Sequence, residues 1–418
     1  MTTMIPVLPA FDQSTLQRLR DIDPIVQRYR ARFALFDWSD IDPPPKRGPG
    51  RPGHPSSAYL KAALVRIDEH LLSTPRWRAY LLDHPLLVLE LGFRPHLDLR
   101  QPYGFDVATT VPSVRHLNTI LRTLDPRRLA DLLEQTVGAL QQEIPGLGEV
   151  VAFDVKHIYA NVKENNFRAY VLERFKKDQQ PTGDPDCRLG VKKSTNQEQP
   201  DGSIKEKKEL LWGYGSGVAA AITPDYGDVV LAEFTQPFNE NDVTYFIPLY
   251  IQTVAILDAF PVHITADAAF DAWYAYQTCA FRRGIAAIPT NQHAHPVYAR
   301  DADGIPRCPA GLRMHPTYAF EHTNGYHAQR YRCPLLYPAR TGQTCDHEQF
   351  AQGKGCVKDI NIEAGGLMRV TLDRDSPLYK AVYTRAVPRA NASTARPRTS
   401  ALSGPKRATS ARCATSIP

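Results

Sequence analysis

The sequence has no run of about 18 consecutive apolar residues, the length that a membrane-spanning helix needs. Its start, from Met1 to Pro6, has no basic segment followed by an apolar one, so we expect no secretory signal and a cytoplasmic location. Its seven cysteines include no C-x₂-C pair, and an odd number without a signal argues against a disulfide framework. With 43% hydrophobic and 22% charged residues, the composition is that of an ordinary globular protein.

Acidic residues are missing from the last 34 residues, Arg385 to Pro418, where seven Lys and Arg residues lie. The whole chain has 50 basic and 44 acidic residues, so the remainder has 43 basic and 44 acidic ones and a net charge of −1. The tail also shows neither the helical nor the strand period of apolar residues, which predicts disorder for 386–418. The net charge of +6 therefore gives no support to nucleic-acid binding by the rest of the chain.

Residues 1–145 are predicted to form a helical N-terminal domain, because apolar residues recur there at spacings of three and four. Ser or Pro stands at several of the expected helix starts. The expected helices cover 14–36, 56–72, 76–91, 113–124 and 127–142. The Pro- and Gly-rich segment from Pro43 to Pro55 cannot be helical and interrupts them.

After Pro145, short apolar runs alternate with helical periods, which predicts an α/β core over 146–295. The expected strands are 149–154, 210–222, 229–234, 262–267 and 286–289, and the expected helices are 242–259 and 272–283. Two insertions are expected: a Lys-rich loop at 161–209 and a Cys/His-rich segment at 296–375. A final core helix is expected to begin within 376–385.

Two aspartates each end an apolar, strand-like run: Val151-Ala-Phe-Asp154 and Ile264-Thr-Ala-Asp267. At the carboxyl ends of neighbouring strands, Asp154 and Asp267 would meet at one edge of the sheet. Paired carboxylates hold divalent metal ions, and two such ions clamp the attacking and leaving oxygens in phosphoryl transfer. Either residue could instead end a strand or cap a helix without any role in catalysis.

The order of these motifs resembles that of the DDE transposases of bacterial insertion sequences, over roughly residues 45 to 385. The matching features are Gly50-Arg51-Pro52 ahead of a helix, Val151 to Asp154, Gly213-Tyr214-Gly215 at the opening of a hairpin, and Thr265 to Asp271. The resemblance implies a ribonuclease-H-like core in which Asp154 and Asp267 bind Mg²⁺ or Mn²⁺ for DNA strand cleavage and transfer. Asp271 is instead expected to cap the helix that begins near Ala272.

The third metal ligand of this family, a Glu on a late helix, has no counterpart here. Leu378 to Arg385 resembles the start of the family's Tyr-x-x-Arg-x-x-x-Glu pattern. Aligned on Tyr383, the Arg and the Glu would fall at Ala386 and about Ala390. We therefore expect weak metal binding and slow or absent turnover.

A frameshift near Arg385 would explain both the missing acid and the unusual tail. Suitable codons for Ala390 to Pro397, read one nucleotide out of frame, give Glu-Arg-Ile-Asn-Ser-Gln-Ala, which resembles the segment that follows the Tyr/Arg pattern in the family. The alternative is a basic, disordered tail that is read in the correct frame.

Four cysteines lie in the second insertion: Cys308, Cys333, Cys345 and Cys356. Four thiolates are a common ligand set for tetrahedral structural zinc, and a metal would explain how a segment with few apolar residues folds. Their spacings of 25, 12 and 11 lack the paired motif of typical zinc knuckles, so reduced, half-buried thiols are an equal alternative.

Double-stranded DNA is the expected partner, with a homo-oligomer assembled on it. The candidate contacts are Lys46, Arg47 and Arg51 in a Pro/Gly-framed arm, of a kind that can enter a minor groove, and Lys192 and Lys193 in the Lys-rich segment. Trp273, Tyr274 and Tyr276 could stack on a base, although packing on a helix face is the simpler role. Two functions are compatible with these features: a transposase, or a non-catalytic protein derived from one that occupies the ends of the element.

Overall fold

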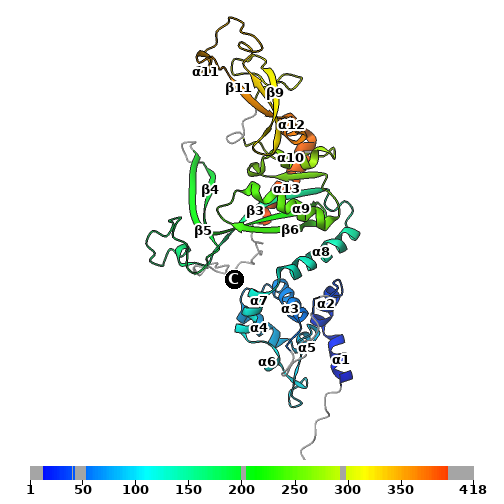
Figure 1. Ribbon diagram of the computed structural model, residues 1–418. Helices are drawn as coiled ribbons and strands as arrows, with labels where there is room; N and C mark the ends of the chain where they lie inside the picture. The colour runs from blue at the N-terminus through cyan, green and yellow to red at the C-terminus, as the bar shows by residue number, and fades with distance from the viewer. Residues whose placement is uncertain (1–12, 40, 43–52, 199–203, 292–297, 394–418) are drawn as a thin grey trace, which may run out of the picture. The chain divides into compact units, whose positions relative to one another are not determined.

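The computed structural model describes residues 13–39, 41–42, 53–198, 204–291 and 298–393 (Figure 1). The chain combines helices with a mixed sheet, which confirms the predicted α/β class. It divides into two compact units, the first of which ends at Gln142 while the second begins at Glu143. Within the described residues, no helix combines the length and the apolar character that a membrane span requires.

The first unit is mainly helical, as predicted, but two expected helices are each broken by a proline. Its elements are α1 (Gln13–Ile22), α2 (Pro24–Phe33), α3 (Ser56–Asp68), α4 (Thr74–Asp83), α5 (Pro85–Glu90), β1 (His96–Leu97), β2 (Phe105–Asp106), α6 (Val107–Thr110), α7 (Val114–Thr123) and α8 (Pro126–Glu143). Pro24 and Pro85 each begin a helix, because proline disfavours the helical conformation of the residue before it and suits the first helical turn.

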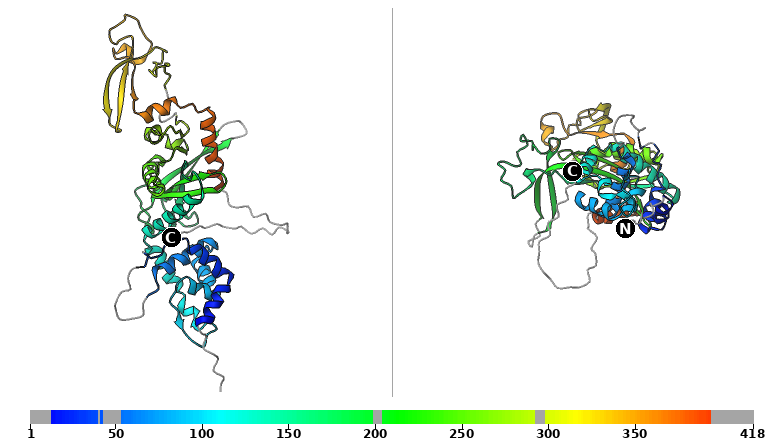
Figure 2. Two further views of the ribbon diagram at one scale, coloured as in Figure 1. Left: turned by 90° about the vertical axis from the view of Figure 1, so that its right-hand side faces the viewer. Right: turned by 90° about the horizontal axis from the view of Figure 1, so that it is seen from below.

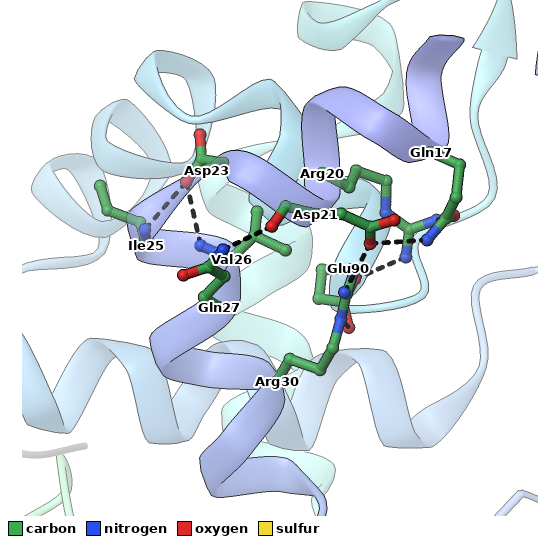
Figure 3. A network of polar contacts seen from close by, with 9 residues as sticks. All are labelled: Gln17, Arg20, Asp21, Asp23, Ile25, Val26, Gln27, Arg30 and Glu90. Atoms are coloured by element: carbon green, nitrogen blue, oxygen red, sulfur yellow. Dashed lines mark hydrogen bonds and ion pairs between the residues drawn. The ribbon is translucent and has the colours of Figure 1, made fainter. Parts of the chain in front are cut away.

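Polar contacts fix the α1–α2 corner of this unit (Figure 3). The Asp23 carboxylate accepts hydrogen bonds from the backbone N–H groups of Ile25 and Val26, at 2.9 and 3.0 Å, and so caps α2. The Arg30 guanidinium donates to both oxygens of Glu90 on α5, at 3.0 and 2.9 Å. This corner closes over a buried core that includes Val26, Trp77 and Leu81.

The second unit is built on a six-stranded mixed sheet. The elements up to β8 are β3 (Val150–Tyr159), η1 (Lys163–Asn165), β4 (Arg188–Glu198), β5 (Ile204–Thr223), β6 (Gly227–Pro237), η2 (Asp242–Tyr245), α9 (Phe246–Leu257), β7 (His263–Ala266), η3 (Ala268–Phe270), α10 (Trp273–Ala280) and β8 (Ala286–Ala287). The strand order is β4-β5-β3-β7-β8, with β6 also paired to β5. Strand β5 is antiparallel to β3, β4 and β6, whereas β3, β7 and β8 are parallel.

The expected Lys-rich loop at 161–209 is only partly a loop. Residues 188–198 form β4, and 204–209 are the first part of β5, to which β4 pairs. These strands were not predicted because their charged residues show no alternation with apolar ones. Backbone hydrogen bonds to the neighbouring strand hold them in place. Residues 160–187 contain only the short η1 and pack around the buried Trp212, whose indole N–H donates to the carbonyl of Arg174 at 2.7 Å.

Gly213 to Gly215 stand at the opening of the β5–β6 hairpin, as expected, because the antiparallel pairing of these strands begins at Tyr214, opposite Pro237, and runs to Thr223, opposite Gly227. Gly215 also has a packing role. A Cβ at this position would lie 2.2 Å from the hydroxyl oxygen of Tyr245, so glycine allows η2 and α9 to approach the sheet closely.

Helices pack on both faces of the sheet, following the alternation of β3. Phe153 contacts Phe246 of α9, with ring centroids 5.0 Å apart. Val150, on the opposite face, packs with Tyr379 and Val382. These last two residues belong to α13 (Pro377–Ser393), red in Figure 2, which contacts β3, β7 and β8.

The remaining elements are β9 (His315–His322), β10 (Tyr326–Arg332), α11 (Glu348–Ala351), β11 (Val357–Asn361) and α12 (Ala364–Thr371). Strands β9, β10 and β11 form a separate antiparallel sheet within the predicted Cys/His-rich insertion. The backbone of α13 extends through 386–393, where disorder was predicted, so that boundary is wrong. Residues 394–418 lie outside the described part of the chain.

Candidate functional site

The sequence predicted Asp154 at the end of a strand, but it lies in the middle of β3. The strand continues because 154–159 pair with β5, on the side of β3 away from β7. The neighbouring β7 stops at Ala266, so Asp154 comes directly after the last parallel pair, Phe153 with Ala266. Its carboxylate accepts a 2.9 Å hydrogen bond from the N–H of Val155 and remains exposed.

Asp267 follows β7 directly, in the predicted position. Because β3 and β7 are parallel and in register up to Phe153 and Ala266, Asp154 and Asp267 are the next residues on neighbouring strands. The Asp267 carboxylate caps η3 by accepting a 2.9 Å hydrogen bond from the N–H of Ala269. The sheet therefore brings the two predicted carboxylates together, with both side chains accessible to solvent.

A third carboxylate, Asp242, belongs to the same site and was missed in the sequence. It is the first residue of η2, which packs against β3 and η3. Burial raises the pKa of Asp242 to about 6, with further contributions from the charges of Asp267 and Asp154. The only local feature that could have indicated Asp242 as a site residue was its position ahead of a helix, and many acids in that position are N-caps.

The pKa values of both predicted carboxyl groups are raised, and the charge of Asp267 contributes to the shift of Asp154. Burial raises the pKa of Asp154, and the charge of Asp267 raises it further. Burial also raises the pKa of Asp267, against the effect of its backbone hydrogen bonds. The carboxylate tips are reachable by solvent, but the surrounding protein disfavours their charged forms. A divalent cation would relieve this cost.

Helix α13 passes the same site. Burial raises the pKa of Tyr383, and the charge of Asp267 raises it further, which places this residue of α13 within electrostatic reach of the carboxylate. The sequence after Asp375 contains no acid, so α13 adds no carboxylate. Within the described residues, no three His, Cys, Asp or Glu side chains are arranged to hold a metal ion as they stand.

A cavity of about 470 Å³ is lined in part by Val243, Ala269, Trp273 and Tyr274, whereas Asp154, Asp242 and Asp267 are not among its lining residues. Two of the aromatic residues proposed for base stacking therefore face it, and Trp273 also contacts Tyr326 of β10, with centroids 5.7 Å apart. The third, Tyr276, is fully buried and has the packing role.

Asp271 was predicted to cap α10, and this prediction is wrong because Ala272 occupies the N-cap position. Burial alone would raise the pKa of Asp271, but hydrogen bonds and the charge of Arg369 hold it below its ordinary value. The Arg369 guanidinium donates to both oxygens of Asp271, at 2.7 and 2.6 Å. Tyr276 donates to one of the same oxygens at 2.9 Å. This buried network joins α12 to the segment that comes after Asp267.

The predicted DNA contacts cannot all be located. Lys46, Arg47 and Arg51 lie outside the described residues. Lys192 and Lys193 lie on β4, opposite Glu209 and Lys208 of β5.

The four cysteines of the insertion come together. Cys308, Cys333 and Cys356 are buried in one cluster, and the half-buried Cys345 packs against it. Burial raises the pKa of Cys356 to about 12, with contributions from Cys333 and Cys308.

Comparison of the chain with protein-family models, with curated proteins and with solved structures found no match. The function is therefore inferred from the residues and the geometry of the site.

Replacing Asp242 by Asn is expected to stabilise the second unit at high pH. The folded protein holds a proton on Asp242 up to about pH 6, whereas the unfolded chain loses it near pH 4. The free energy of unfolding therefore falls as pH rises through this window, by on the order of 2 kcal/mol. Asp242→Asn should be more stable than the parent by about this amount at pH 8 and similar to it at pH 4.

Urea unfolding at both pH values, monitored by hydrogen exchange of β5 peptides, reports the second unit alone. Asp225→Asn, at an exposed position between β5 and β6, is the matched control. Equal gains in the two variants, or no gain at pH 8, would contradict the assignment of Asp242 to the site.

Proposed function

We propose that the chain is a DNA transposase of the DDE type, whose Asp154 and Asp267 bind Mg²⁺ or Mn²⁺. The observation that carries the proposal is their placement on adjacent positions of the parallel strands β3 and β7, with Asp242 beside them. The oxygen donors, their solvent access and the raised pKa values of both carboxyl groups suit a divalent cation. Metal ions bound there would stabilise the attacking and leaving oxygens of a phosphodiester.

The topology supports a ribonuclease-H-like core. Strands β3, β5 and β6 form an antiparallel succession, and β7 and β8 then extend the sheet parallel to β3. Helix α9 connects the antiparallel part to β7, and α10 connects β7 to β8. The two strand-borne carboxylates fall at the centre of this arrangement.

The site lacks the third carboxylate ligand of the family. The family's glutamate would lie on α13, near Ala390, about two turns beyond Tyr383. No acid follows Asp375 in the chain, and the carboxylates that the described residues bring to the site are Asp154, Asp242 and Asp267. We therefore propose that this chain cleaves DNA slowly or not at all, and that a frameshift near Arg385 replaced the ligand. Sequencing the gene through codon 385 tests the frameshift, since a shifted frame with stop codons would contradict it.

A second function is favoured by the same missing acid: a non-catalytic, transposase-derived protein that binds the ends of the element. In both cases the partner is double-stranded DNA. The Lys-rich β4–β5 hairpin and the arm with Lys46, Arg47 and Arg51 are the proposed contacts, and a homo-oligomer would assemble on the DNA.

Cleavage and binding assays separate the two functions. The substrate is a plasmid that carries the gene with its natural flanking DNA, incubated with about 5 mM Mn²⁺, an amount on the order of that needed by weak carboxylate sites. Nicking at the element ends that Asp154→Ala abolishes supports the transposase. End-specific binding without nicking supports the second function. Binding that shows no end preference and no dependence on salt would contradict both.

A further inference from the structure

The sheet of the insertion places two cysteines opposite each other. Strand β10 ends at Arg332 and β11 begins at Val357, and these two residues are register partners in the antiparallel pair. Cys333 and Cys356, the next residues outward on the two strands, therefore face each other at one end of the sheet. A Cβ on Gly355 would lie 2.5 Å from the Cβ of Cys333, so glycine is required for this close approach.

A third cysteine reaches the same end from β9. His315, the first residue of β9, pairs with Arg332, so the chain just before β9 lies beside Cys333. Cys308 begins a tight turn there: the N–H of Gly311 donates to the carbonyl of Cys308, and the N–H of Cys308 donates to the carbonyl of Leu312, both at 2.9 Å. Cys345, on the connection between β10 and β11, packs against the same cluster with Leu336 and Phe350.

The insertion has too few other buried residues to hold this arrangement. Between 298 and 362, all of them described, the buried apolar residues are Pro306, Cys308, Met314, Ala328, Cys333, Leu335, Cys356 and Ile360. Three of these eight are cysteines. The side chains of β9 are mostly exposed, so the sheet covers no large core. Small modules with so little apolar burial generally need a disulfide or a metal.

We propose that Cys308, Cys333, Cys345 and Cys356 bind a structural zinc ion at this end of the sheet. Four thiolates are a complete tetrahedral ligand set. Each thiol would lose its proton to solvent on binding, and the bound ion would be closed to substrates. The proposal is independent of DNA cleavage, because it concerns how the insertion folds.

Binding requires small side-chain movements. The sulfur atoms do not yet surround a common point, since the described residues include no group of three ligands ready to hold a metal. Rotation about the Cα–Cβ bond moves each sulfur between staggered positions, and Cys345 is only half-buried. His322 and His327 lie at the opposite end of the β9–β10 pair from the cysteines. The nearer histidines are His315, which pairs with Arg332 next to Cys333, and His347, whose Nδ1 accepts a 3.3 Å hydrogen bond from the N–H of Gln349.

Zinc content of the full chain, purified under reducing conditions without chelators, tests the proposal. We expect about one zinc per chain, released by about four equivalents of a mercurial reagent. Cys345→Ser and Cys356→Ser should lower the zinc content at least fivefold, whereas Cys279→Ser should retain it. Cys279 is the matched control, because it is buried in α10 outside the cluster.

Because a serine variant could fail to fold, hydrogen exchange of the unaltered chain gives a second test. A zinc chelator should speed exchange of β10 and β11 peptides at least tenfold and leave β5 peptides unchanged. A zinc content below about 0.1 per chain, before and after reduction and incubation with Zn²⁺, would overturn the proposal. So would fewer than seven free thiols in the denatured chain, since the cluster would then form disulfides.

Discussion

Replacing Ala390 by Glu is expected to raise Mn²⁺-dependent nicking at the element ends by about 100-fold or more over the parent chain. Helix α13 carries Tyr383 within electrostatic reach of Asp267 and extends through Ser393. On the proposed alignment with the family, a carboxylate at 390 would stand where the third metal ligand stands. Charge stabilisation by a fully ligated metal is worth several kcal/mol, and about 1.4 kcal/mol corresponds to a factor of ten in rate.

The matched control is Ala390→Gln, because the glutamine side chain has nearly the same size as that of glutamate but no charge. It should remain at the parent rate, and adding Asp154→Asn to Ala390→Glu should remove the gain. If Ala390→Glu and Ala390→Gln nick DNA equally, the helix does not supply the third ligand.

Replacing Asp271 by Ala is expected to lower the free energy of unfolding of the second unit by about 3–5 kcal/mol. The Asp271 side chain is fully buried and that of Arg369 is 11% exposed. Removing the carboxylate leaves the guanidinium buried without its partner, and breaking a buried pair costs much more than the pair itself contributes. Urea unfolding, monitored by hydrogen exchange of α10 and α12 peptides, measures the loss.

The double variant Asp271→Leu with Arg369→Met separates this cause from a simple packing defect. It should recover at least half of the loss, because no buried charge remains. A single variant that loses less than about 1 kcal/mol would mean that Arg369 finds water or another acceptor. An equal loss in the single and double variants would mean that packing dominates.

The sequence predicted most of the helices and the strands with apolar runs, because their periodicity reflects which face is buried. It failed where contacts between distant segments decide the structure. Strand β4 is polar and forms through its pairing with β5. Asp154 was placed at a strand end because its apolar run stops there, but β5 pairing carries β3 on to Tyr159.

The sequence predicted two acids of the candidate site, Asp154 and Asp267. It did not predict Asp242 or the pairing of Asp271 with Arg369. Asp267 comes after an apolar strand, and that pattern is local. Asp242 is 25 residues from Asp267 and becomes part of the site only because η2 packs against the sheet. Asp271 and Arg369 are 98 residues apart and are separated by the whole insertion. No local pattern could pair them.

Binding of Mn²⁺, measured by the loss of the free-ion signal in electron paramagnetic resonance, tests the central claim most directly. The unaltered chain should bind with a dissociation constant on the order of 1 mM, as expected for a site without its third ligand. Asp154→Asn and Asp267→Asn should each weaken this binding at least tenfold, and Asp225→Asn, at an exposed acid in the β5–β6 turn, should not change it. Coincident titration curves for all four proteins would show that Asp154 and Asp267 are not a metal site.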